Sequence, residues 1–415
     1  MDLEMRQVNG FASAPSSLME RGLKAYAELK EKKRPADSLG WVSPNAWVTE
    51  EALSHIEEVA GEIRKKAEVL LLIGIGGSNQ GARAVIDGLG NPSSCKVIWA
   101  GNTLSSWEYE RTLKELEGKD FCIDVIAKNF ETLEPGVAFR VFRKELERRY
   151  GKAANRYIYT TGTRGSHLEG LSQKEGYTFL TFPTDIGGRY SIFSDVGLLP
   201  IAVAGLSIRN LAKGAGDEAE EIDKDPASLV RYAAMRNDLY GKGYRIEMES
   251  FYEPRLFRFA KWWTQLMAES EGKDGKGIYP VIGSYSEDLH SVGQFVQDGS
   301  PIIFEHFIKV TGQDSAIALP DDGIDDRFSY VSGKTLWEVN RTSQEATIRA
   351  HAERLPVFTI EIEKISEYEL GRLFYYFMTA CAVSGRILGI DPFDQPGVEA
   401  YKNLMFENLG KGERV

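Results

Sequence analysis

A glycine-rich segment at residues 74–78, Gly-Ile-Gly-Gly-Ser, carries the clearest chemical signal in the sequence. It follows the apolar run VLLLI, and the residues after it, NQGARAVIDGL, have a helical pattern. Gly74, Gly76 and Gly77 leave room for backbone N–H groups to approach an anion, and Ser78 adds a hydroxyl near the helix start. We interpret the segment either as a phosphate cradle or as a tight turn between a strand and a helix that binds no ligand.

Two nucleotide-binding motifs that also use glycine loops do not fit this spacing. A dinucleotide fingerprint G-x-G-x-x-G that begins at Gly74 requires glycine at position 79, where the sequence has Asn79. A P-loop from Gly76 to Gly81 requires lysine at position 82, which is Ala82. The spacing therefore weakens the case for a nicotinamide dinucleotide or a nucleoside triphosphate.

Histidine and cysteine, which supply many metal ligands, are scattered along the chain. No two of the five histidines have metal-ligand spacing, and Cys95, Cys122 and Cys381 form no C-x-x-C pair. We expect neither a metal nor another cofactor. Unpaired, scattered cysteines suit a reducing compartment, and no basic region followed by an apolar run opens the sequence. We therefore expect a cytoplasmic protein without a secretory signal.

The charge of the chain narrows the range of partners. Its formal net charge of -11 at pH 7 argues against non-specific binding to nucleic acid and against an anionic membrane surface. It does not exclude a small anionic substrate, because a few cations and backbone N–H groups can hold a phosphate in an acidic protein.

The elements that would position these residues alternate between strands and helices in two regions of the chain. Such alternation predicts an α/β protein with mostly parallel sheets that are covered by helices. Strands are expected in the first region at 69–75, 96–101, 120–127, 156–161 and 178–182, and in the second at 245–251, 278–285, 301–310 and 356–365.

The predicted organisation has three parts. Residues 1–45 form an N-terminal helical arm, residues 46–190 a first domain with the glycine loop, and residues 191–415 a second domain that ends in helices. The acidic stretch 212–225 is read as a flexible hinge or a surface helix. The aromatic cluster within the helix expected at 253–272 is read as core or interface packing.

At this point the chain resembles the phosphoglucose isomerase family, which is built from two sugar-isomerase (SIS) domains. Five blocks carry the resemblance, occur in the order of the family and together are highly specific. They are IGIGGSNQG (73–81), DIGGRYSIFSDVGLLPIAVAG (185–205), QLMAESEGK (265–273), DLHSVGQFVQDG (288–299) and GIDPFDQPGVEAYK (389–402).

The resemblance implies an aldose–ketose isomerase that interconverts glucose 6-phosphate and fructose 6-phosphate, in glycolysis and gluconeogenesis. Glu269 matches the base that moves a proton between C2 and C1, and Arg189 matches the arginine that stabilises the enediolate. His290 and Lys402 match the residues that assist ring opening. The chemistry needs one carboxylate base and cations near the oxygens that become charged.

The resemblance also implies the residues that bind the substrate and its phosphate. They are Gly77, Ser78, Lys128, Thr132, Gln265 and Gln395. One stretch departs from the family pattern of Ser-Lys-Ser/Thr, because Ala127 and Asn129 replace two hydroxyl residues and Glu131 adds a negative charge. This departure predicts a weaker phosphate site, or one that relies more on Ser78 and backbone N–H groups.

In this family the histidine reaches the active site from the neighbouring subunit, so the resemblance implies a homodimer with shared active sites. Two alternatives stay open. The first is an isomerase of another phosphosugar, such as mannose 6-phosphate, or a dual enzyme. A non-catalytic SIS-domain sensor of phosphosugars would keep the glycine loop without the catalytic set.

Overall fold

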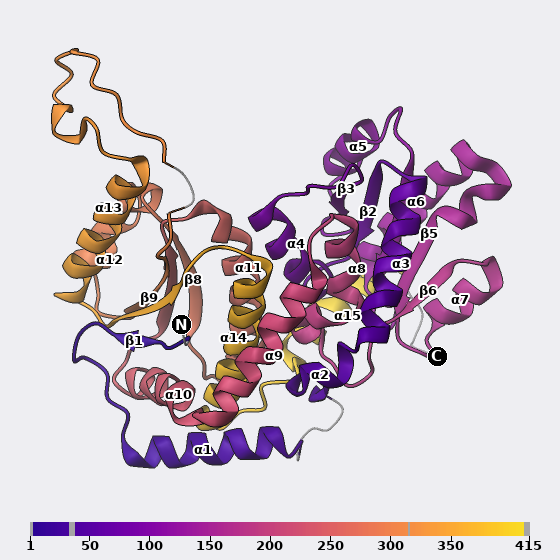
Figure 1. The fold of residues 1–415 in the computed structure, drawn as a ribbon. Coiled ribbons are helices and arrows are strands. Elements are labelled where there is room, and N and C mark those ends of the chain that lie inside the picture. The colour runs from indigo at the N-terminus through magenta and orange to yellow at the C-terminus, as the bar shows by residue number, and fades with distance from the viewer. Residues whose placement is uncertain (1–2, 33–37, 314–315, 411–415) are drawn as a thin grey trace.

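The computed structural model describes residues 3–32, 38–313 and 316–410, and these form two sheet-centred units side by side (Figure 1). The strands are β1 (Arg6–Gln7), β2 (Val69–Ile73), β3 (Lys96–Ala100), β4 (Phe121–Ile126), β5 (Ile158–Gly162), β6 (Thr178–Thr181), β7 (Ile246–Phe251), β8 (Tyr279–Ser284), β9 (Ile303–Val310) and β10 (Val357–Ile362). The α-helices are α1 (Ser16–Lys30), α2 (Pro44–Trp47), α3 (Glu50–Lys66), α4 (Gly77–Leu89), α5 (Ser106–Glu115), α6 (Leu133–Tyr150), α7 (His167–Glu175), α8 (Asp195–Val203), α9 (Ile208–Lys224), α10 (Pro226–Gly241), α11 (Phe257–Glu271), α12 (Gly293–Asp298), α13 (Leu336–Ala352), α14 (Glu367–Leu388) and α15 (Glu399–Asn408).

The first sheet is parallel throughout, in the order β3-β2-β4-β5-β6. All five residues of β2 are buried, because helices cover both faces of the sheet. Leu70 and Leu72 belong to a core that includes side chains of α3, α4 and α8, while Leu71 and Ile73 belong to a core formed largely with α6. The continuous apolar run therefore gives a central strand that is covered on both sides.

The order in which successive strands are added to this sheet changes direction at β2. From β2 it moves to β3 on one side, and it then returns to β4 on the other side. In open parallel sheets the crevice at the carboxyl ends of two such strands is the usual ligand site. The helices that follow β2 and β4, α4 and α6, both begin at this crevice.

The second sheet has the order β1-β10-β9-β7-β8. Strands β7 to β10 are parallel, and the two residues of β1 add an antiparallel edge next to β10. The fold class is thus confirmed: two units, each with a mostly parallel sheet flanked by helices. The boundaries at 45 and 190 stay a prediction, although β1 and α1 pair with β10 and pack against α10 and α14 of the second unit.

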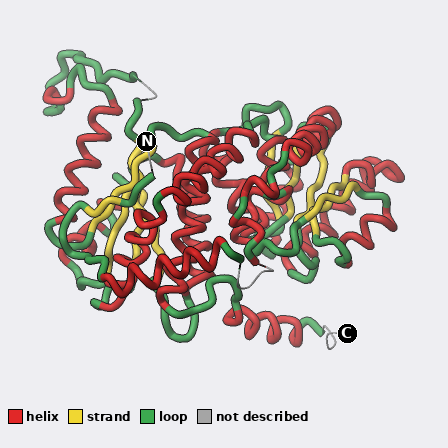
Figure 2. Tube along the Cα trace, turned by 60° about the horizontal axis from the view of Figure 1, so that its bottom comes forward, coloured by secondary structure: helices red, strands yellow, loops and turns green. Residues whose placement is uncertain are grey.

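Helices join the two units. Helix α11 packs against α4 of the first unit and against β8 and α14 of the second, and α14 also packs against α9 and α10. Figure 2 shows a layer of helices between the two sheets. Trp262, Trp263 and Phe259 on α11 are buried in this layer, which confirms the predicted core packing, whereas Phe257 at the start of the helix is 37% exposed.

The reading of residues 212–225 as a flexible hinge is wrong, because residues 212–224 lie in helix α9, which packs closely against α14, and Asp225 caps the next helix, α10. A Cβ added at Gly214 would lie 2.0 Å from the carbonyl oxygen of Tyr368, and one added at Gly371 would lie 2.1 Å from that of Leu211. The small residues of this acidic stretch therefore allow two helix backbones to approach each other.

A long arm separates β9 from α13 and projects from the body of the second unit (Figure 1). In its described part, residues 311–313 and 316–335, four large apolar side chains are exposed: Ile317 by 62%, Ile324 by 67%, Phe328 by 59% and Tyr330 by 70%. Across the described ranges, the helices are too short or too polar to cross a membrane.

Candidate active site

The candidate site is a cleft with a volume of about 630 Å³, within the range of small-molecule sites. It lies at the carboxyl ends of β2 and β4 and is closed by the end of α11 and by α15. It brings together every predicted site residue except His290. These residues are Gly77, Ser78, Lys128, Thr132, Arg189, Gln265, Glu269, Gln395 and Lys402.

The glycine loop forms one wall of the cleft. Gly76 has a φ of +57°, which glycine adopts without strain, and Gly77 begins α4. A Cβ at Gly77 would lie 2.1 Å from the carbonyl group of Gly188, so the loop packs directly on the backbone of the Arg189 segment. The buried Asn79 donates from Nδ2 to the carbonyl oxygen of Gly74 at 2.8 Å, which braces the turn.

The stretch after β4 forms the facing wall. Thr132 is the N-cap of α6, and its side chain accepts no capping hydrogen bond from the helix. The first turns of α4 and α6 both line the cleft, and the positive ends of these two helices favour an anion there. Lys128 Nζ donates to the carbonyl oxygens of Thr184 and Ile186, at 3.0 and 2.9 Å. Its ammonium group is thus held at the rim of the cleft.

Arg189 is buried, and its guanidinium group is fixed from several sides. Nε donates to Ser270 Oγ at 2.9 Å, Nη2 donates to the carbonyl oxygen of Pro392 at 2.7 Å, and Nη1 lies 3.5 Å from Gln395 Oε1. Trp262 donates from Nε1 to the carbonyl oxygen of Arg189 at 3.2 Å. A guanidinium held in this way presents a cation in one orientation, at little entropic cost when a ligand binds.

Glu269 lies beside this cation. Its Oε2 is 3.6 Å from Arg189 Nη1 and accepts a hydrogen bond from Gln265 Nε2 at 3.1 Å. The side chain of Glu269 is 31% exposed, so it can reach a substrate in the cleft while part of it is shielded from water. Gln265 Oε1 is buried and has no hydrogen-bond partner among the described residues, which leaves an acceptor for a ligand hydroxyl.

A family model described as Phosphoglucose isomerase matches residues 50–411. The chain belongs to the phosphoglucose isomerase family. The glucose-6-phosphate isomerase of Shouchella clausii (strain KSM-K16) is 43% identical over 405 residues, which cover 93% of this chain and 90% of that protein. That of Bacillus cereus (strain AH187) is 43% identical over 394 residues, covering 90% of this chain and 87% of that protein.

Solved structures share the fold of this chain. A hypothetical protein from Thermus thermophilus superposes with a TM-score of 0.88 at 26% identity, covering 95% of this chain and 97% of that one. A glucose-6-phosphate isomerase from Chlamydia trachomatis superposes with a TM-score of 0.80 at 19% identity, covering 95% and 84%. The second likeness shows a shared fold.

The two residues predicted to assist ring opening in this phosphoglucose isomerase family member, Lys402 and His290, lie in different places. Lys402 of α15 lines the cleft, and its Nζ lies 2.9 Å from Glu399 Oε1. His290 ends the 3₁₀ helix Glu287–His290 after β8, is exposed, and does not line the cleft. Within a single chain, the structure therefore does not bring His290 together with Glu269.

Sequence reasoning missed some residues of the site. Ser270 fixes Arg189 from beneath, and Glu134, in the first turn of α6, lines the cleft. The position of Ser270 could have suggested a supporting role. It lies between Glu269 and Glu271 on one helix, where successive side chains point in different directions. Glu134 gave no such signal, since an acidic residue in a first helical turn is common for reasons of helix stability alone.

Proposed function

We propose that the chain is a glucose-6-phosphate isomerase, which converts glucose 6-phosphate reversibly to fructose 6-phosphate by ring opening and a cis-enediolate intermediate. The observation that carries this proposal is the Glu269 carboxylate, 3.6 Å from the fixed guanidinium of Arg189, in a cleft with two helix N-termini. A base, an oxyanion partner and an anion site within one cleft are the parts that this reaction needs.

In the proposed mechanism, the N-termini of α4 and α6 hold the phosphate, with Ser78, Thr132 and Lys128 around it. Glu269 takes the proton from C2 of the open-chain aldose, and the electron pair of that bond forms the C1–C2 double bond while O1 gains negative charge. Arg189 stabilises that charge. The O2 proton is transferred to O1, Glu269 returns its proton to C1, and O2 becomes the ketose carbonyl.

Orientation of the sugar is assigned to the two glutamines. The unpartnered Oε1 of Gln265 accepts from a sugar hydroxyl, and Gln395 lies next to Arg189 at the other side of the cleft. Neutral amides are suited to this role because they bind hydroxyls without competing with Glu269 or Arg189 for charge.

Ring opening is assigned to Lys402 and to His290 of a second copy, which makes the enzyme a homodimer with shared sites. Two observations support this assignment. His290 is exposed and lies outside its own cleft, and the arm between β9 and α13 exposes apolar side chains on the same unit. We assign to the dimer the arrangement in which His290 of one copy reaches the cleft of the other. The reaction is assigned to glycolysis and gluconeogenesis in the cytoplasm.

Replacing the base tests the mechanism. We expect Glu269→Gln to lower kcat by about 10³-fold or more, with little change in phosphosugar affinity, because the amide keeps the shape of the side chain but cannot accept the C2 proton. A coupled assay of glucose 6-phosphate turnover and calorimetric titration with the product measure the two effects. Turnover equal to that of the unaltered enzyme would refute the assignment of the base.

Mixing two inactive variants tests the shared site. If His290 acts in the partner's cleft, Glu269→Gln and His290→Asn subunits, refolded together in equal amounts, form heterodimers with one intact site of two. Random pairing then restores about a quarter of the unaltered activity. Each variant refolded alone is the control. No recovery, with heterodimers verified by mass, would contradict the shared site.

Selectivity among phosphosugars is the second question, and Ala127, Asn129 and Glu131 motivate it. These residues replace hydroxyls and add a charge next to the phosphate-binding helix α6. Turnover of mannose 6-phosphate, measured beside glucose 6-phosphate, decides between a single and a dual isomerase. Binding of both sugars without isomerisation of either would instead identify a sensor.

A further inference from the structure

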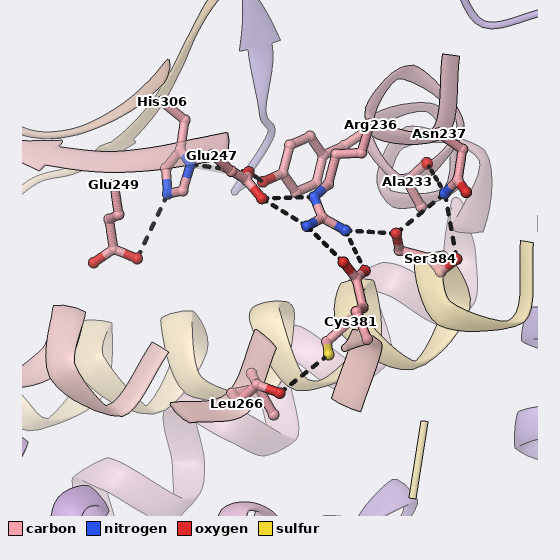
Figure 3. Close-up of polar contacts among 11 residues, drawn as sticks. Ala233, Arg236, Asn237, Glu247, Glu249, Leu266, His306, Cys381 and Ser384 are labelled. Atoms are coloured by element: carbon pink, nitrogen blue, oxygen red, sulfur yellow. Dashed lines mark hydrogen bonds and ion pairs between the residues drawn. The ribbon is translucent and has the colours of Figure 1, made fainter. Parts of the chain in front are cut away.

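Directly behind the last turn of α11 lies a buried cluster of charged side chains (Figure 3). Arg236 of α10 donates from Nη1 and Nη2 to the two carboxylate oxygens of Glu271, at 2.5 and 3.2 Å. Its Nε donates to Glu247 Oε2 of β7 at 2.8 Å, and Nη1 also donates to Ser384 Oγ of α14 at 2.5 Å. The cluster thus ties the end of α11 to three other elements. No step of the proposed reaction uses it.

The pKa values of His306 and Glu247 depend on the other members of this cluster. Burial opposes the charged form of His306, but its hydrogen bond with Glu247 and the Glu249 carboxylate 3.5 Å from its Nε2 outweigh this effect and raise the pKa of His306 to about 9. Burial also opposes ionisation of Glu247, but Arg236 and His306 together outweigh it through their charges and hydrogen bonds and lower the pKa of Glu247 to about 2. Arg236 therefore lies beside a Glu247 carboxylate that stays charged near neutral pH.

The last turn of α11 presents three consecutive side chains to three different surroundings. Glu269 faces the cleft, Ser270 accepts a hydrogen bond from Arg189 Nε at 2.9 Å, and Glu271 is held by Arg236. Successive residues of a helix are rotated by about 100° around its axis. The contacts of Ser270 and Glu271 therefore set the direction in which Glu269 points.

Stability alone is a weak reason for such a cluster. A buried ion pair adds little net stability compared with well-packed apolar side chains of the same volume, and its best-attested role is to select one arrangement. The arrangement selected here is that of the turn that carries Glu269. Its partners lie on α10, β7 and α14, all of which belong to the layers of the second unit.

We propose that Arg236 and Glu271 are positioning residues for the isomerisation, whose two-point contact holds the end of α11 so that the Glu269 carboxylate is directed at the substrate carbons. This inference rests on the proposed function, because it takes Glu269 as the base. A base displaced by about 1 Å can lose about 100-fold in rate. Loosening the contact is therefore expected to act on kcat rather than on the binding of the phosphate.

The main test variant is Glu271→Gln, which keeps the shape of the side chain and one acceptor for Arg236 but removes the charge and the two-point contact. Arg236→Lys is the second variant, because an amine cannot make the paired hydrogen bonds of a guanidinium. We expect each to lower kcat by about 10-fold to 100-fold, with KM changed less than about threefold.

Glu218→Gln is the matched control. Glu218 of α9 is buried, and its Oε2 lies 3.0 Å from both Nε and Nη2 of Arg372 on α14. Arg372 is more than three helical turns away from Ser384, so this pair is separate from the Arg236 cluster. All assays are run at pH 8, since burial raises the pKa of Glu218 to about 7 and the carboxylate should be charged in the unaltered enzyme. We expect Glu218→Gln to leave kcat unchanged, and thermal unfolding measured beside the assay verifies that the variant is folded.

A double-mutant cycle with Glu269→Gln separates positioning from general damage. If Arg236 and Glu271 act through the base, Glu271→Gln lowers kcat in the unaltered enzyme but leaves the residual rate of Glu269→Gln unchanged. Equal losses in both backgrounds, an effect on KM alone, or an unaltered kcat in folded Glu271→Gln would each overturn the inference. Failure of the proposed function is a separate outcome, because the enzyme without substitutions would then not isomerise glucose 6-phosphate.

Discussion

The contact between the glycine loop and the arginine segment allows a prediction about a single methyl group. A Cβ at Gly77 would lie 2.1 Å from both the carbonyl carbon and the oxygen of Gly188 and 2.6 Å from the amide nitrogen of Arg189. Ordinary van der Waals contacts of a Cβ begin near 3.4 Å, so Gly77→Ala is short of space by more than 1 Å. The atoms in the way belong to the backbone and cannot rotate aside.

Two effects should follow from Gly77→Ala. Overpacking of a close contact costs about 1–3 kcal/mol in unfolding free energy, and we expect the upper part of this range because no side chain can yield. The loop and the Arg189 segment must also move apart. Since displacement by about 1 Å can cost about 100-fold in rate, kcat should fall by one to two orders of magnitude. Urea unfolding and the coupled isomerase assay measure the two quantities.

Gly188→Ala is the matched control because it lies on the other side of the same contact. A Cβ at Gly188 would meet one atom, the Cα of Gly77, at 4.0 Å. Its unfolding free energy should therefore stay within about 0.5 kcal/mol of that of the unaltered protein. Equal stability of both variants, or a Gly77→Ala enzyme with full activity, would refute the close contact and the reasoning built on it.

Two further predictions concern the first unit. Burial raises the pKa of Asp124 to about 7, although the carboxylate accepts one hydrogen bond from Thr161 at 3.1 Å, so between about pH 4 and 7 the folded state keeps a proton that the unfolded state has released. Stability present at low pH is thus lost over this window. Asp124→Asn lacks the titrating group, so between pH 5 and 8 its unfolding free energy should rise by on the order of 2–4 kcal/mol relative to that of the unaltered protein. Parallel stability curves of the two proteins would contradict this. Thr49 caps α3 by accepting a hydrogen bond from the amide of Ala52 at 3.2 Å, so Thr49→Ala should cost about 1 kcal/mol in denaturant unfolding, whereas no loss would mean that the cap is not formed in solution.

The fold could be predicted from the sequence because its strands are buried on both faces. A strand such as VLLLI is apolar at every position, and the glycines and helical patterns that follow it mark the crossover to the next strand. Helices α10 and α13 were missed although their starts carry signals. Asp225 and Pro226 open the first, and Thr335 with Glu338 forms a capping box at the second.

The candidate site was predicted only as far as local motifs reach. The glycine loop suggested an anion site from its own residues, and the roles of Glu269 and Arg189 followed from the resemblance to a family. The contact of Gly77 with Gly188 and that of Arg236 with Glu271 join residues far apart in sequence. No periodicity or cap encodes such pairs, since each depends on how the helices of the two units are packed.

The proposed reaction moves negative charge from Glu269 to the substrate. The 3.6 Å distance between Arg189 and Glu269 places both positions of this charge beside one cation. Before the reaction the guanidinium faces the carboxylate. When Glu269 takes the C2 proton, its negative charge disappears and an equal charge develops on O1 of the substrate. Arg189 then has one anionic partner in place of another, so proton transfer moves a charge within its reach without creating an unpaired ion. Because its partners Ser270 and Pro392 keep the guanidinium in place, this exchange requires little reorganisation, which is the condition under which electrostatic stabilisation lowers a barrier most.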